Sequence, residues 1–183
     1  KPLTDYLTGK ATSWDNGRCG LHVHVGREAL GKSAEEQSET LGKLLYLYHH
    51  IVKDTEFNTK VFGRSRSYNE HDGKTEVGNA VGLLGGETLL KNKEICKRVG
   101  DAMKERSSDN RYFDINLQNV NTIEFRKGKG SLKPERIAMI VEYCLILVGF
   151  AKRSPWSGIS AMRWRDYVRE HAKNVLLKEY IAT

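Results

Sequence analysis

Two short segments of the chain alternate polar and apolar residues, and this pattern constrains the fold more than any other feature. They are CGLHVHVG at 19–26 and NTIEFRK at 121–127. Successive side chains of a strand point to opposite faces, so His22 and His24 share one face, as do Glu124 and Arg126. If both strands join one sheet, two imidazoles, a carboxylate and a guanidinium meet on a single surface.

The apolar residues of the two segments predict the opposite, buried face of that sheet. They are Leu21, Val23, Val25, Ile123 and Phe125. On the polar face, Thr122 accompanies the two charged residues of the second segment, because it has the same parity in the strand. One face of each strand is therefore expected to pack on a core.

The polar face carries residue types suited to a divalent cation and a phosphate. Neutral imidazole nitrogens bind divalent metals, and carboxylate oxygens suit magnesium or manganese. A guanidinium such as that of Arg126 grips phosphate or carboxylate through its planar fork. The alternative for each short motif stays open, because opposite charges on an exposed strand also occur as solvated partners.

The rest of the chain predicts helices around these strands. Ser33 and Glu36 have the spacing of a capping box, which opens a helix expected to reach about Lys53. The other predicted elements are an irregular stretch at 54–86, helices at 87–105, 134–152 and 162–180, and a hairpin formed by 111–118 and the 121–127 strand. This pattern predicts an α+β fold built on an antiparallel sheet.

Length and composition predict a globular core followed by a terminal helix. With 183 residues, 39% of them hydrophobic, the chain can form one domain with a substantial core. We expect the core over 1–153 and an amphipathic helix packing on it over 154–183. The three cysteines show no metal-ligand spacing, and reduced thiols are the simplest interpretation.

Charge and hydropathy narrow the expected partners and location. The formal charge of +7 favours acidic partners, but the basic residues are dispersed among acids, so nucleic acid is the weaker interpretation. The sequence shows neither an apolar run of about 18 residues nor a leader pattern, so we predict a cytoplasmic protein without a membrane partner. The chain begins at Lys1, and we expect part of the active protein to lie upstream.

Five motifs in order along the chain resemble the amidoligase family, carboxylate–amine ligases with a glutamine synthetase-like fold. The motifs are CGLHVHVG at 19–26, RSRSYN at 64–69, RYFDINL at 111–117, TIEFR at 122–126 and GSL at 130–132. The resemblance covers about residues 19–151. It implies an antiparallel sheet of the glutamine synthetase-like catalytic type, packed by helices.

The resemblance also implies an activity, cofactors and partners. The expected reaction is ATP-dependent: a carboxylate is phosphorylated to an acyl phosphate, and an amine then displaces the phosphate to form an amide. ATP with Mg²⁺ or Mn²⁺ is the implied cofactor set. The substrates would be a carboxylate and an amine, a peptide being one option, and an oligomer is compatible with this expectation.

Site residues follow from the same resemblance, position by position. The implied metal ligands are His22 and Glu124. Arg126 is expected to face the transferred phosphoryl group or the substrate carboxylate, with Arg64 and Arg66 as further anion-binding residues of the catalytic set. The residues expected to contact the nucleotide are His24, Arg111 and Asn116.

The chain departs from the family pattern at one point, which leaves an alternative function open. Glutamine synthetase-like sites also use two carboxylates on an upstream strand, and no E-x-E motif precedes His22. We therefore expect that strand either upstream of Lys1 or missing, in which case turnover would be lost. The alternative is a non-catalytic binding or assembly module derived from this fold, for instance one that a phage encodes and that acts in the host cytoplasm.

Overall fold

A three-stranded antiparallel sheet forms the base of the structure. The computed structural model describes residues 20–53, 55–63 and 114–182. The strands are β1 (Gly20–Gly26), β2 (Ile115–Asn116) and β3 (Thr122–Lys129), in the order β1-β3-β2. β3 is therefore the central strand, with β1 and β2 paired antiparallel along its two edges.

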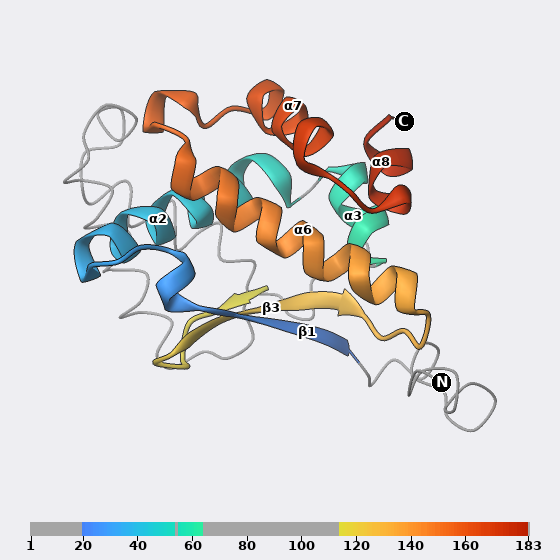
Figure 1. The fold of residues 1–183 in the computed structure, drawn as a ribbon, viewed down its shortest axis with the longest axis horizontal. Coiled ribbons are helices and arrows are strands. Elements are labelled where there is room, and N and C mark those ends of the chain that lie inside the picture. The colour runs from blue at the N-terminus through green and yellow to red at the C-terminus, as the bar shows by residue number, and fades with distance from the viewer. Residues whose placement is uncertain (1–19, 54, 64–113, 183) are drawn as a thin grey trace.

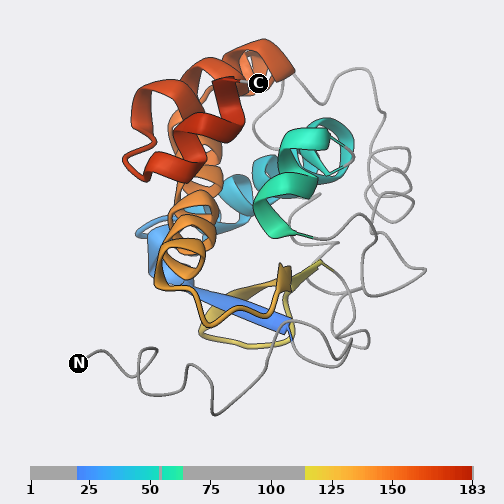
Figure 2. The same cartoon turned by 90° about the vertical axis from the view of Figure 1, so that its right-hand side faces the viewer.

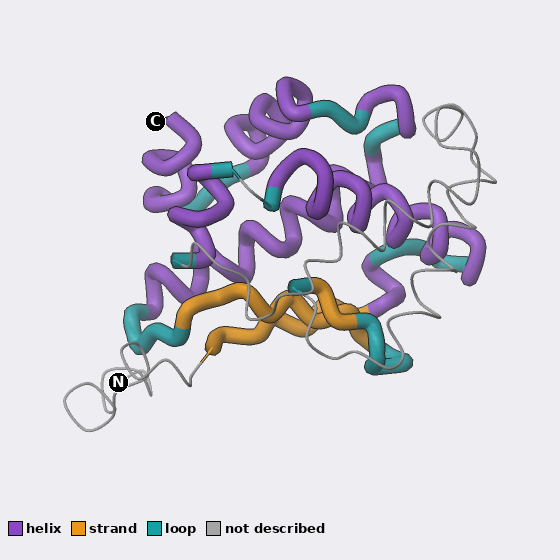
Figure 3. Tube along the Cα trace, turned by 180° about the vertical axis from the view of Figure 1, so that it is seen from behind, coloured by secondary structure: helices purple, strands orange, loops and turns teal. Residues whose placement is uncertain are grey.

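The helices of the described residues lie on one side of this sheet (Figures 1 and 2). They are α2 (Ala34–Tyr46), a π-helical segment (Leu47–Val52), α3 (Glu56–Phe62), α6 (Pro134–Arg153), α7 (Ala161–His171) and α8 (Val175–Ala182). The long helix α6 crosses above the sheet, and α7 and α8 lie beyond it. Figure 3 shows the same two layers from behind, with the strands below the helices.

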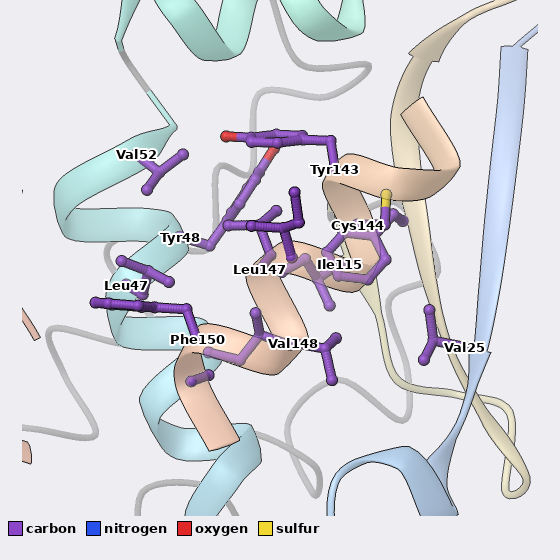
Figure 4. Packing of buried hydrophobic residues seen from close by; sticks show 14 of the residues in the cluster. Val25, Leu47, Tyr48, Val52, Ile115, Tyr143, Cys144, Leu147, Val148 and Phe150 are labelled. Atoms are coloured by element: carbon purple, nitrogen blue, oxygen red, sulfur yellow. The ribbon is translucent and has the colours of Figure 1, made fainter. Parts of the chain in front are cut away.

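The core lies between α6, the sheet, and α2 with its π-helical extension (Figure 4). Val23, Val25, Ile123 and Phe125 are all less than 10% exposed, and Leu21 is partly buried against the core, so the predicted apolar face of the sheet is confirmed. The thiol of Cys144 lies in the same core, and its burial raises its pKa well above the ordinary value.

Several predictions about the elements are confirmed. The fold is α+β around an antiparallel sheet, β2 and β3 form the expected hairpin, and α6 matches the helix predicted at 134–152. The Ser33 hydroxyl caps α2 by accepting from the backbone N–H of Glu36 at 3.2 Å. The Glu36 carboxylate completes this cap by accepting from the N–H of Lys32 at 2.7 Å.

The prediction of an irregular segment at 54–86 was wrong in its first part, because α3 begins at Glu56. The Thr55 hydroxyl caps this helix by accepting from the N–H of Asn58 at 3.1 Å. Gly63 ends it in the left-handed conformation, with φ of 72°. Val61 and Phe62 are buried, so a helix of two turns is stabilised by packing that no periodic pattern reveals.

The prediction of a single helix at 162–180 was also wrong, because α7 ends at His171 and a second helix, α8, begins at Val175. The carboxylate of Glu142 on α6 accepts from the backbone N–H groups of Lys173 and Asn174, at 2.6 and 2.8 Å. The Asn174 side chain then accepts from the N–H of Leu176 at 3.0 Å and caps α8. A long-range acceptor on α6 thus interrupts a continuous helical pattern.

The helix predicted at 87–105 lies outside the described residues. Within the described ranges, no helix is both long and apolar enough to cross a membrane.

Candidate functional site

Glu124 lies at the centre of a polar cluster on the face of the sheet that is turned away from the helices. In the strand register, its direct neighbours are His24 on β1 and Asn116 on β2. His22 lies two residues before His24, on the same face of β1. The middle strand of the sheet therefore presents the carboxylate, and both flanking strands supply its partners.

Each carboxylate oxygen of Glu124 has its own set of contacts. Oε1 lies 2.7 Å from His22 Nδ1 and 3.6 Å from His24 Nε2. Oε2 accepts from Asn116 Nδ2 at 2.8 Å and from Arg126 Nη1 at 3.3 Å. One oxygen thus faces the two imidazoles, and the other is held by an amide and a guanidinium.

The cluster is accessible from solvent at its histidines and enclosed at its carboxylate. The side chains of His22 and His24 are 35% and 49% exposed, while that of Glu124 is 10% exposed. Arg126 is intermediate at 22%. A ligand approaching this face would meet the imidazoles first and the carboxylate beneath them.

The charge state of Glu124 follows from opposing influences. Burial alone would raise its pKa, but the Asn116 hydrogen bond, then the charge of Arg126, then those of His22 and His24 act in the opposite direction. Their sum lowers the pKa of Glu124 below its ordinary value. The group is therefore an anion at neutral pH, as a carboxyl group that binds a cation must be.

A β-bulge between β1 and β3 sets the position of the first histidine. Leu21 pairs with Gly128 and Val23 pairs with Phe125, so His22 faces two residues of β3. A Cβ at Gly128 would lie 2.6 Å from the Leu21 carbonyl oxygen, so glycine permits the close approach of the two backbones. Bulges of this kind re-aim side chains beside functional sites.

Thr122 contributes a contact that the sequence analysis did not assign. Its hydroxyl oxygen lies 3.1 Å from Nδ1 of His24, which places the other ring nitrogen toward Glu124. The period of two had put Thr122 on the correct face. The pairing itself depends on the strand register, which the sequence pattern does not give.

The donor types partly fit a divalent metal. A carboxylate and an imidazole are available in Glu124 and His22, and magnesium is commonly held by one or two carboxylates together with substrate phosphates. Across residues 20–53, 55–63 and 114–182, however, no group of three or more His, Cys, Asp and Glu is arranged to hold a metal ion. These two residues can therefore supply part of a coordination sphere that phosphate oxygens and water would complete.

The structure brings five of the eight predicted site residues together, namely His22, His24, Asn116, Glu124 and Arg126. Asn116 is 6% exposed and donates to Glu124, and its expected contact with a nucleotide stays a prediction. Its Oδ1 accepts from the N–H of Gln118 at 3.0 Å. The predicted anion-binding residues Arg64, Arg66 and Arg111 lie outside the described part of the chain.

The chain matches no family model, no curated protein and no solved structure.

Proposed function

We propose that this chain carries the metal and phosphate site of an ATP-dependent carboxylate–amine ligase. The observation that supports the proposal most is the convergence of His22, Glu124 and Arg126 on one face of the sheet, with the carboxylate at its centre. The resemblance to amidoligases and the antiparallel sheet backed by helices favour a glutamine synthetase-like fold. On this proposal the cofactors are ATP and Mg²⁺ or Mn²⁺.

The proposed reaction has two steps. A carboxylate oxygen of the substrate attacks the γ-phosphorus of ATP, and the bond from that phosphorus to the bridging oxygen breaks to release ADP. The lone pair of the amine then attacks the acyl carbon, inorganic phosphate leaves, and the nitrogen loses a proton. An amide, ADP and phosphate are the products.

His22 and Glu124 would hold the metal in this reaction. When bound, the cation neutralises negative charge on the ATP phosphates. The Asn116 hydrogen bond to Oε2 fixes the carboxylate. It leaves Oε1 facing His22, so that this oxygen and an imidazole nitrogen could bind the same cation. Asn116 acts on this proposal as a positioning residue.

Arg126 would stabilise the transferred phosphoryl group. One of its Nη atoms lies 3.3 Å from Glu124 Oε2, so it is held beside the proposed metal site. A guanidinium has five N–H donors, and this contact leaves others that can bind phosphoryl oxygens. His24, on the more exposed side of the cluster, lies where a nucleotide could contact it.

Turnover of ATP by the purified protein tests the proposal. We expect ADP to form with Mg²⁺ when a carboxylate substrate is present, and hydroxylamine to trap the acyl phosphate as a hydroxamate. Glu124→Ala should abolish both products because it removes the central carboxylate. Glu170→Ala is the matched control, since Glu170 is exposed on α7, a helix that lies beyond α6 from the sheet.

Two results would count against this function. Unchanged ADP formation in Glu124→Ala would remove the proposed role of the carboxylate. Binding of Mn²⁺ and ATP by the wild type without any ADP formation, across a panel of carboxylates and amines, would instead favour the non-catalytic binding module.

A further inference from the structure

A buried hydrogen bond connects the helical layer to the strand that supports the site. The Tyr48 hydroxyl, on the π-helical segment, donates to Asp114 Oδ2 at 3.0 Å. Both residues are buried, with exposures of 1% and 3%. Asp114 immediately precedes β2, so this bond ties the beginning of β2 to the helices above the sheet.

The same segment of backbone reaches Glu124 by two routes. The carbonyl of Asp114 accepts from the N–H of Arg126 at 2.8 Å, which continues the β2–β3 ladder by one pair. Two residues later, Asn116 donates to Glu124 Oε2. The position of Asp114 thus affects both side chains that hold this oxygen of the carboxylate.

The Tyr48 hydroxyl is suited to act as a permanent donor. Burial, followed by the negative charge of Asp114 and the hydrogen bond to it, raises the pKa of Tyr48 well above its ordinary value. The hydroxyl therefore keeps its proton at neutral pH and well above it. A second tyrosine, Tyr143 on α6, donates to Asn58 Oδ1 at 3.1 Å in the same part of the core. Figure 4 shows the two tyrosine rings beside each other.

The sequence pattern makes the side-chain direction of Asp114 unexpected. Strict alternation back from Asn116 would put Asp114 on the polar face of the sheet as well. Its side chain is instead bonded to Tyr48 in the core. A carboxylate buried next to a hydroxyl costs desolvation free energy, which a fully apolar contact at this place would avoid.

We propose that Tyr48 is a positioning residue of the site, acting through Asp114 to hold β2 where Asn116 fixes the Glu124 carboxylate. This inference deepens the proposed function and rests on it for its consequence in metal binding. Tyr48 touches neither metal nor substrate. Its effect reaches them through the orientation of one carboxylate, in the manner of outer residues that orient metal ligands.

The test compares Tyr48→Phe with Val168→Ala. The first removes one hydroxyl and keeps the ring, whereas the second removes buried methyl groups from α7, on the far side of α6 from the sheet. Both variants should lose stability, and only Tyr48→Phe should affect the site. The readouts are the NMR resonances of the Asn116 side-chain amide without metal, and the Mn²⁺ affinity by titration calorimetry.

We expect Tyr48→Phe to shift the Asn116 amide resonances and to raise the Kd for Mn²⁺ about tenfold, as loss of outer-shell partners does. Val168→Ala should change neither. The inference would be overturned if the Asn116 resonances, or the Kd for Mn²⁺, were the same in Tyr48→Phe as in a wild type that binds Mn²⁺. If the wild type binds no Mn²⁺, the proposed metal function fails, and the Asn116 resonances alone decide whether Tyr48 positions the carboxylate.

Discussion

At the scale of single residues, the site consists of one carboxylate held from both sides. Glu124 receives its contacts from β1, from β2 and from its own strand, so its orientation is fixed before any ligand arrives. Pre-orientation of this kind reduces the free energy that a metal or phosphate must spend on ordering side chains. The Asn116 amide does not ionise, and its removal isolates its contribution.

Asn116→Ala should raise the pKa of Glu124 and destabilise the protein at neutral pH. The wild-type pKa is lowered, so the stabilisation by the ionised carboxylate is present above the unfolded-state pKa and is lost as the pH falls through the folded-state pKa. Without the amide donor we expect a loss of about 1–3 kcal/mol at pH 7 that shrinks at acid pH. In metal-free buffer, urea denaturation at pH 7 and at acid pH measures the loss of stability, and ¹³C NMR titration of Glu124 measures the change in its pKa.

Asn121→Ala provides the control for that experiment. It makes the same chemical change at an exposed residue of the β2–β3 turn. A Glu124 titration that is identical in Asn116→Ala and the wild type would show that the amide does not set the charge of the site.

At the scale of elements, the β1–β3 pairing brings the histidines to the carboxylate. The bulge opposite His22 needs a close approach of the backbones at Leu21 and Gly128. This makes the glycine a structural requirement of the site, although it carries no functional group.

Gly128→Ala should weaken this pairing. The added Cβ would lie 2.6 Å from the Leu21 carbonyl oxygen, and relieving that overlap should cost about 1–3 kcal/mol of unfolding free energy. Gly149→Ala is the control, because its Cβ would approach no backbone atom and only the Tyr167 hydroxyl, at 3.2 Å. Equal urea midpoints for the two variants would contradict the role given to the bulge.

Alternation predicted the strands well because it reports directly on which face is buried. It gave the correct faces for His22, His24, Glu124 and Arg126, and the hairpin connection indicated the antiparallel β2–β3 pair. Contacts set by distant residues were missed: the Glu142 carboxylate that separates α7 from α8, and the inward turn of Asp114. Neither leaves a periodic signal, because each depends on a partner that only the tertiary fold supplies.

At the scale of the whole molecule, the described helices lie on one side of the sheet (Figure 2). The polar cluster around Glu124 lies on the other face of the strands. The apolar face of the strands packs on α6 and anchors the backbone, which leaves the other face available for chemistry. The sheet is thus rigidly supported behind the site, as a preorganised site requires. The Tyr48–Asp114 bond connects the helical layer directly to the start of β2.

The central claim is that His22 and Glu124 together bind a divalent cation. Anomalous diffraction from crystals of the wild type and of Glu124→Gln, each soaked with Mn²⁺ and ADP, tests it most directly. We predict a Mn²⁺ peak in contact with both His22 and Glu124 in the wild type and none at that place in the variant. Mn²⁺ bound only elsewhere, or an equal peak in Glu124→Gln, would contradict the claim.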